Sequence, residues 1–328
     1  MLTKKKRTIL FWLSIAAFFI ILAPVLIYSS GYRIGPNFTL IKTGGIYVKT
    51  SISGAMVSID GTKKKSTSLI SGSALIKNIG PGIHRTVVSH DRYLDWKKNL
   101  EVETEMVTSR EVLLVPAEIK GEMLGTTTIP VLAEYFLKKN SLYGYDENKK
   151  EKVIYTGVKK YWFYEGRILI FGEDGNLYLN GEPFNVPESW GLKAGTILKS
   201  KSNSFFANNK SRLIYWDDAG IDSYWIEDIN KLPQWQNPKA LSEGVDRYLH
   251  IYSTDESIRA VYEYPGYSDY LLAEISNGIF VLEMEAEGGQ NIFPLYKGKN
   301  PKIVWHSKIS TDRLLILDDG NYIVLELP

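Results

Sequence analysis

Adjacent acidic residues at predicted hairpin tips are the first candidates for chemistry in this sequence. Glu173-Asp174, Asp217-Asp218 and Asp318-Asp319 each lie close to a glycine. Two carboxyl groups held roughly 5 to 10 Å apart are the machinery of a glycoside hydrolase. Aspartate near glycine is also typical of a turn, because its side chain accepts hydrogen bonds from nearby backbone N–H groups. The turn interpretation is favoured, and a carbohydrate-active enzyme with carboxylates near a central channel is the alternative.

Other side chains that commonly do chemistry are few. The four histidines are His84, His90, His250 and His306, and none lies three or four residues from another, so no metal-binding pair is predicted. The chain has no cysteine, which excludes disulfides and thiolate sites. It has no Gly-x-Ser-x-Gly elbow and no phosphate-binding glycine loop. We therefore predict no catalytic residue, no metal and no cofactor, and a protein that is not an enzyme.

Aromatic residues in predicted loops give one indication of a ligand-binding surface. Tyrosine and tryptophan on loops suit faces that bind proteins or sugars. The alternative is that these rings pack between neighbouring sheets. The predicted ligand contacts are Tyr262, Tyr264, Tyr267, Tyr270, Trp190 and Trp235.

The elements that position these residues begin with an uncharged N-terminal run. A basic cluster, Lys4 to Arg7, precedes the run from Ile9 to Tyr28, which contains no charged residue. About twenty helical residues at about 1.5 Å each span about 30 Å, the thickness of a bilayer core. The sequence therefore predicts a transmembrane helix over residues 9–29. Because positive flanks stay inside, residues 1–8 are expected in the cytoplasm and the bulk of the chain outside the cell membrane.

A cleaved signal peptide is the alternative for the same run. Its apolar region normally covers about 7 to 15 residues and ends in small residues before the cleavage site. Here the run is longer, and Ile27 and Tyr28 precede Ser29. Either interpretation exports the rest of the chain. The net charge of +2 is too small to indicate nucleic-acid binding.

Residues 30–43 contain Gly31, Gly35, Pro36 and Asn37 and predict a membrane-proximal linker. From residue 44 the pattern changes to short strands. Ala55, Val57 and Ile59 alternate with polar or exposed positions, which is the period of a strand with one buried face. Asp60-Gly61 and Gly80-Pro81-Gly82 then predict tight turns. We expect a small β-sandwich over residues 44–116.

The order of these strands and turns resembles the PEGA family of exported β-sandwich modules. The matching positions are Gly54-Ala55, Val57, Ile59, Asp60-Gly61, Gly80-Pro81-Gly82, His84, Val88, Tyr93 and Leu113-Leu114. The chain departs from the family at Ile52-Ser53, where the family has Pro-Glu, and at Arg92, where glycine usually precedes the tyrosine. The resemblance implies a binding or wall-associated module of the bacterial cell envelope rather than a catalyst.

Residues 117–328 contain four degenerate repeats. Each joins a basic residue, a short apolar strand and a turn, and the starting residues Arg167, Arg212, Arg259 and Arg313 lie 45, 47 and 54 residues apart. Hairpins at spacings of about 40 to 50 residues are typical of β-propeller blades. We expect a four- or five-bladed propeller-like domain, with a strand near 142 and one near 325 closing it. A second β-sandwich is the rival. Helix is expected only at 130–138 and 238–243.

Taken together, these features predict a mainly β protein held in the membrane by one helix. It would present the PEGA-like module and the propeller platform to an envelope protein or a cell-wall polysaccharide.

Overall fold

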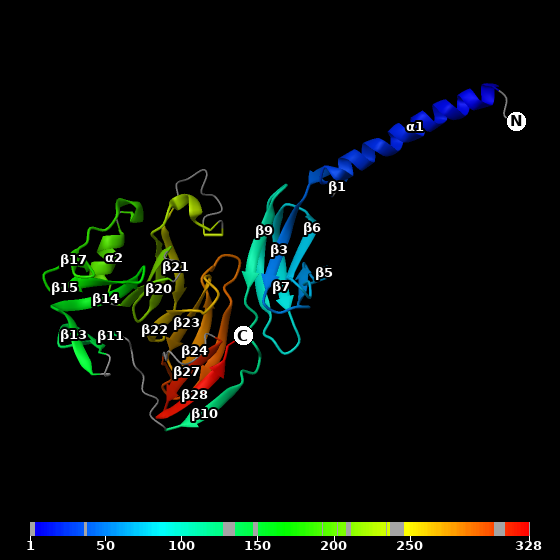
Figure 1. The fold of residues 1–328 in the computed structure, drawn as a ribbon. Helices are drawn as coiled ribbons and strands as arrows, with labels where there is room; N and C mark the ends of the chain where they lie inside the picture. The colour runs from blue at the N-terminus through cyan, green and yellow to red at the C-terminus, as the bar shows by residue number, and fades with distance from the viewer. Residues whose placement is uncertain are drawn as a thin grey trace. The chain divides into compact units, whose positions relative to one another are not determined.

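A computed structural model describes most of the chain (Figure 1). The described residues are 4–35, 38–126, 135–146, 150–191, 193–201, 203–207, 211–233, 235–236, 246–304 and 312–327. The chain divides into two compact units, Met1–Leu114 and Val115–Pro328.

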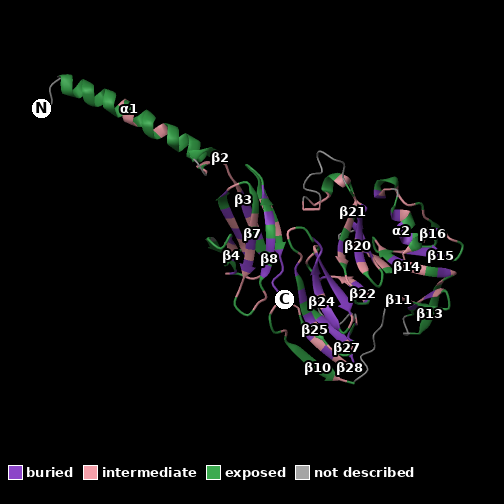
Figure 2. Ribbon diagram, turned by 180° about the vertical axis from the view of Figure 1, so that it is seen from behind, coloured by how far each residue is buried: buried purple, intermediate pink, exposed green. Residues whose placement is uncertain are grey.

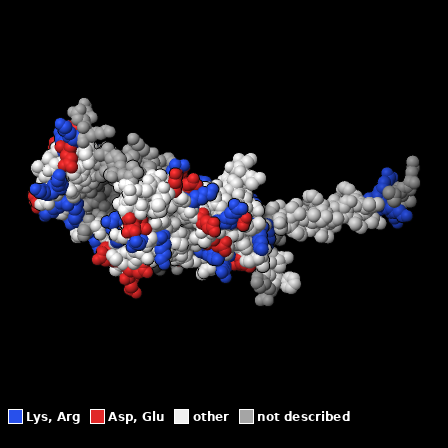
Figure 3. Space-filling model, turned by 90° about the horizontal axis from the view of Figure 1, so that it is seen from below, with Lys and Arg blue, Asp and Glu red and all other residues white. Residues whose placement is uncertain are grey.

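The first unit begins with helix α1, Lys4–Ser29. Among the described residues it is the one helix long and apolar enough to cross a membrane, and none of its apolar stretch is buried (Figure 2). Its basic end and the uncharged surface that follows are visible in Figure 3. The predicted N-terminal apolar helix is confirmed, and it fits a single-pass anchor or a signal sequence. It starts at Lys4 rather than residue 9, because lysine and arginine are good helix formers.

The segment predicted as a linker, residues 30–43, contains a two-stranded sheet. Strands β1 (Tyr32–Ile34) and β2 (Leu40–Lys42) pair antiparallel. Thr43 closes the base of this hairpin, since its backbone N–H and its hydroxyl both donate to the carbonyl of Gly31, at 3.2 and 3.0 Å. The sequence predicted a membrane-proximal linker here, and the described residues of this segment include two paired strands.

Two further sheets make up the rest of the first unit. One has the order β6 (Ser73–Ile79), β3 (Gly44–Thr50), β9 (Val107–Val112), and the other β5 (Lys63–Ser66), β4 (Met56–Ile59), β7 (Gly82–Ser89), β8 (Trp96–Val102). Strand β8 buries every second residue, and its first residue, Trp96, is fully buried. The pairing of β3 with β9 is parallel, whereas the other pairings are antiparallel.

His84 lies on β7. Its Nε2 atom lies 2.8 Å from the carbonyl oxygen of Gly80. Its Nδ1 atom also lies 2.6 Å from a carboxylate oxygen of Asp60. The ring therefore ties the turn after β4 to the turn before β7, which is a structural role.

The described part of the second unit contains five antiparallel sheets. Four follow one another along the chain. The first contains β11 (Tyr135–Lys138), β12 (Ser141–Tyr145) and β13 (Glu151–Thr156), and the second contains β14 (Val158–Tyr164), β15 (Arg167–Gly172), β16 (Leu177–Leu179) and β17 (Glu182–Pro183). The third contains β18 (Asn203–Phe206), β19 (Arg212–Trp216), β20 (Gly220–Trp225) and β21 (Tyr248–Ser253), and the fourth contains β22 (Ile258–Glu263), β23 (Tyr270–Ile275), β24 (Gly278–Glu283) and β25 (Ile292–Lys297). Within each of these sheets, sequential strands are neighbours, so each sheet is a meander.

The fifth sheet joins the two ends of the second unit. Its order is β10 (Gly121–Gly125), β28 (Asn321–Glu326), β27 (Arg313–Asp318), β26 (Lys302–Ile303), so a strand from the start of the unit completes a sheet built from its end. Successive meander sheets, the last closed in this way, are the arrangement of a propeller. The second unit is β-propeller-like.

The predicted closing pair was partly wrong. Strand β28 includes residue 325 as expected, but its partner is β10 rather than the strand at residue 142. Leu142 is fully buried and packs with Val158 and Ile170 in a core shared by the sheets of β12 and of β14 and β15. The strand near 142 therefore belongs to a sheet of its own, formed by β11, β12 and β13.

The repeat register was also partly wrong. Arg167 and Arg212 each begin the second strand of their sheet in chain order, and Arg313 begins β27, the third of its sheet. Arg259 instead lies on β22, the first strand of its sheet. A basic residue followed by apolar residues fits either strand, so the pattern alone does not fix the register.

Helix was misplaced in the second unit. Residues 135–138 form strand β11, whereas 130–134 and 238–243 lie outside the described residues. The short helix α2, Ala194–Ser200, was not predicted.

Candidate functional site

A polar relay of three side chains lies on β20 and the edge strand β21. Asp222 pairs directly with His250 across the two strands, and Gly220 pairs with Ser253. Residues 220 and 222 share one face of β20, so their partners share that face of β21. Residues 250 and 253 would normally point to opposite faces. A β-bulge inserts Ile251 as an extra residue and brings the two side chains together.

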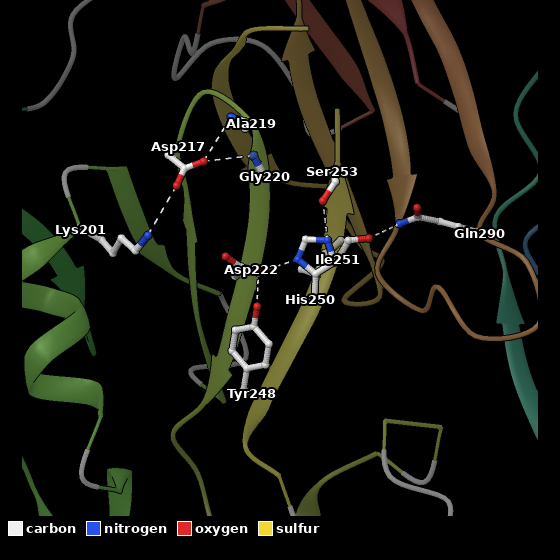
Figure 4. Close-up of polar contacts among 10 residues, drawn as sticks. All are labelled: Lys201, Asp217, Ala219, Gly220, Asp222, Tyr248, His250, Ile251, Ser253 and Gln290. Carbon is white, nitrogen blue, oxygen red and sulfur yellow. Dashed lines mark hydrogen bonds and ion pairs between the residues drawn. The ribbon is translucent and has the colours of Figure 1, made fainter. Parts of the chain in front are cut away.

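The distances in the relay are those of direct hydrogen bonds (Figure 4). The Nδ1 atom of His250 lies 2.8 Å from Oδ1 of Asp222, and its Nε2 atom lies 2.8 Å from Oγ of Ser253. An ionised carboxylate only accepts hydrogen bonds, so Nδ1 of His250 carries a proton and donates it to Asp222. In the neutral imidazole, Nε2 is then the acceptor for the hydroxyl of Ser253.

The carboxylate of Asp222 is held by a second donor. The hydroxyl of Tyr248 donates to the same oxygen at 2.7 Å. Burial raises the pKa of Tyr248 to about 12, and the hydrogen bond to Asp222 and the charges of Asp222 and Asp246 add to that shift. Burial, and then the charge of Asp222, also raises the pKa of Tyr215. Tyr248 therefore stays a donor near neutral pH and holds Asp222 within hydrogen-bond distance of Nδ1 of His250.

The bulge is held by a contact from the loop before β25. The backbone carbonyl of Ile251 accepts a hydrogen bond of 2.7 Å from Nε2 of Gln290, which also donates to the carbonyl of Glu283. The side chain of Ile251 is 1% exposed and packs in the core. In contrast, about half of the His250 side chain is exposed, and Ser253 is exposed as well.

Acidic residues lie in the turn between β19 and β20 and in the segment that follows Ser253. Asp217 caps the turn between β19 and β20, accepting from the N–H groups of Ala219 and Gly220 at 3.1 Å each, and lies 3.5 Å from Nζ of Lys201. Two backbone hydrogen bonds link this turn to the segment after Ser253: Thr254 donates to Ala219, and Ile258 donates to Asp218. Asp217, Asp218, Asp255 and Glu256 are all exposed here.

The acidic pairs singled out in the sequence form turns as favoured. Asp174 accepts from the hydroxyl of Tyr178 and from Asn176, and these hydrogen bonds lower its pKa to about 2. Glu173 and Asp174 also line a hollow of about 380 Å³, where Asn140 donates to Glu173. Asp318 is buried and accepts from two backbone N–H groups. One member of each pair is therefore committed to local backbone or side-chain contacts.

The predicted ligand-binding aromatics are more buried than expected. Tyr264 and Tyr270 are 1% and 0% exposed, and Tyr267 lies between them in edge-to-face contacts at 5.9 and 6.0 Å between ring centroids. Tyr262 is half-buried, and its hydroxyl donates to Glu274 at 3.3 Å. The structure thus brings three tyrosines together, mainly as core. A ligand role for Tyr267 stays a prediction.

The two predicted tryptophans lie apart from these tyrosines. Trp190 is 5% exposed and packs against Tyr164 and Phe206 in a different core cluster. Trp235 is partly buried, and its ring faces the guanidinium of Arg212 at 5.2 Å. Both rings thus pack against other residues of the second unit, as in the alternative interpretation, and a ligand role for them stays a prediction.

No sequence pattern predicts the relay, since a histidine and a serine three residues apart normally lie on opposite faces of a strand. Only the bulge at Ile251 makes them neighbours. Among the described residues, no group of three or more His, Asp and Glu side chains can hold a metal ion.

Comparisons with known proteins give distant similarities. No protein-family model and no curated protein matches the chain, so the PEGA resemblance stays a prediction. A gluconolactonase of Xanthomonas campestris is similar at 10% identity, covering 74% of this chain and 82% of its own, with a TM-score of 0.35.

Two further solved structures are similar at the same level. The β-propeller domain of Cps50 (Swd1) from Myceliophteria thermophila has 12% identity, covers 81% of this chain and 90% of its own, and gives a TM-score of 0.32. A glucose dehydrogenase has 11% identity, covers 74% and 92%, and gives a TM-score of 0.34. These similarities are too low to carry function, and the propeller-like assignment rests on the order of the sheets.

The prediction that the protein is not an enzyme is wrong as stated. The solved structures similar to this chain include a gluconolactonase and a glucose dehydrogenase as well as a propeller domain not named as an enzyme. Enzymatic activity is therefore not excluded for this chain.

Proposed function

We propose that the protein is anchored in the cell membrane of a bacterium by α1 and presents its β-rich units outside the cytoplasm. Its ligand is an envelope protein or a cell-wall polysaccharide. The observation that carries the proposal is α1 itself, an apolar helix with no buried residue in its apolar span and with a basic N-terminal flank. An exposed apolar surface of this length is unfavourable in water, and a bilayer core covers it.

The β1–β2 hairpin supports the same proposal. Only Ser30 and Gly31 separate α1 from β1, so the hairpin lies near the end of the apolar helix. It exposes Ile34, Phe38 and Leu40, at 73%, 92% and 54%. Arg33 stacks over the ring of Tyr28 at 3.6 Å and donates to the Tyr28 carbonyl. Apolar and aromatic side chains beside basic ones suit the bilayer interface, where the polar ends reach the headgroups.

Cysteine labelling tests the topology, because the chain has no cysteine and each introduced thiol is unique. The variants are Ser268→Cys, at an exposed position of the second unit, and Thr3→Cys, before the basic cluster. In intact cells, a membrane-impermeant maleimide should label Ser268→Cys, and it should label Thr3→Cys only after lysis. Both variants should stay in the membrane fraction with the N-terminus uncleaved.

The reverse labelling pattern would contradict the proposed orientation. Release of a shortened chain into the medium would show instead that α1 is a signal sequence. For the ligand, crosslinking mass spectrometry on native envelopes is the test, and recovery of neither an envelope protein nor wall material would count against the proposal.

The hairpin yields a separate prediction about lipid contact. An environment-sensitive fluorophore on Phe38→Cys should be quenched by lipids that carry a quencher near the headgroup, in liposomes containing the full chain. The matched control is Ile83→Cys, because Ile83 is 75% exposed on β7 of the same unit. Equal quenching at the two positions, or none at position 38, would remove the hairpin from the interface.

A further inference from the structure

We infer that Ser253, His250 and Asp222 form a nucleophilic site that transfers acyl groups from small esters. The roles are those that the geometry permits: Ser253 as nucleophile, His250 as base and Asp222 as the positioning residue. Each link is a 2.8 Å hydrogen bond, which meets the distance requirement for an activated hydroxyl. The inference goes beyond the proposed function and does not depend on the membrane anchor.

The proton balance of the step follows from the hydrogen bonds. As Oγ of Ser253 bonds to the carbonyl carbon of an ester, Nε2 of His250 takes the hydroxyl proton. The C–O bond to the leaving alcohol then breaks, and the alcohol receives that proton from Nε2. Water next attacks the acyl-serine by the same route, which releases the carboxylic acid and restores the Ser253 hydroxyl. Asp222 stabilises the transient imidazolium without taking a proton.

The relay of Asp222, His250 and Ser253 is held in place by hydrogen bonds from two further residues. Tyr248 fixes the carboxylate of Asp222, and Gln290 fixes the bulge that turns Ser253 toward His250 (Figure 4). Both supports come from outside the Ser253–His250 pair, one from β21 and one from the loop before β25. The ring is thus held in one tautomer and one orientation, while the hydroxyl it contacts is exposed.

The surrounding charge predicts the class of ester. Asp217 and Asp218 lie in the turn that is hydrogen-bonded to the segment after Ser253, Asp255 and Glu256 lie in that segment, and Lys201 pairs with Asp217. Exposed charges act within a distance of about 8 to 10 Å at physiological ionic strength. A neutral or cationic ester is therefore favoured, and an anionic ester is repelled.

A neutral fluorophosphonate probe tests the nucleophile directly on the full chain in detergent. Peptide mass spectrometry should locate one adduct on Ser253, and Ser253→Ala should lose it. The matched control is Ser257→Ala, at another exposed serine four residues later, which should label like the unmodified chain. His250→Gln should slow labelling by about 100-fold or more, the usual contribution of a general base.

Chemical rescue by imidazole distinguishes a catalytic role of His250 from a structural one. Labelling of His250→Ala should recover when imidazole is added, whereas a residue that only supports the fold would not be replaced by a free base. Acetylthiocholine should be hydrolysed faster than an anionic ester with the same acyl group. The inference is overturned if Ser253 carries no adduct in protein of unchanged melting temperature, or if labelling does not depend on His250.

Discussion

Replacing Trp96 with alanine should destabilise the first unit by about 3 to 5 kcal/mol, the usual cost of removing a large buried aromatic side chain. Trp96 opens β8, pairs with Val88 on β7 and has no exposed surface. Lys98, itself almost fully buried, places its ammonium group 5.9 Å from the indole centroid. Alanine leaves a cavity that these neighbours cannot fill without moving the strand.

Hydrogen exchange resolved by peptide is the suitable measurement, because a chain with two units does not unfold in one step. Peptides from 44–114 should lose protection in Trp96→Ala, whereas those from the second unit should not. The control is Ile83→Ala on the neighbouring strand, where the exposed side chain should contribute within about 0.5 kcal/mol. Equal losses in both variants would show that Trp96 does not anchor this core.

Asp318→Asn should destabilise the second unit by about 3 kcal/mol or more, because hydrogen bonds to a charged acceptor are worth about 1.5 to 3 kcal/mol each. The Asp318 carboxylate accepts from the backbone N–H groups of Lys299 and Asn300, at 3.2 and 2.8 Å, and from the hydroxyl of Tyr296 at 3.0 Å. An amide in its place turns N–H groups toward these donors. Gly298 leaves no room for rearrangement, because a Cβ atom there would lie 1.9 Å from Oδ2 of Asp318.

The pH dependence has a defined sign. Burial opposes ionisation of Asp318, but the hydrogen bonds from Asn300, Lys299 and Tyr296 and the charge of Lys299 outweigh it and lower the pKa. A lowered pKa in the folded state means that the stabilisation is present above the ordinary value of 3.8 and is lost as pH falls through the lowered one. The difference in melting temperature between the original chain and Asp318→Asn should therefore shrink in acid.

The neighbouring aspartate is a matched control. Asp319 is exposed and forms an ion pair with Lys299 at 2.6 Å, so Asp319→Asn should change the melting temperature little. Equal effects at positions 318 and 319 would refute the role of the buried carboxylate.

Strand patterns were the most predictable part of this fold. The alternation at 55–59 lies on β4, because burial of one sheet face leaves a period of two in the sequence. The helix α1 was equally predictable from its uncharged apolar run. Arg259 and Leu142 were assigned to the wrong strands, since short apolar segments carry no information on which sheet they join.

The candidate site was the least predictable part. Asp222 and His250 are 28 residues apart, and they meet only through the register of β20 with β21. Ser253 comes beside His250 only through a single bulge residue, and β-strand propensities do not predict the position of a bulge. The burial of the tyrosines near Pro265 was missed for a different reason. The composition of this segment is that of an exposed loop, whereas Tyr264 and Tyr270 lie in the core.

The closing sheet sets the order in which the second unit is assembled. Gly121 pairs with Leu325, so β10 emerges from the ribosome about two hundred residues before its partner exists. Contacts of such long range are slow to form, and an unpaired strand edge attracts other chains meanwhile. Met123, 67% exposed on β10, lies on the strand that stays unpaired until β28 has been synthesised.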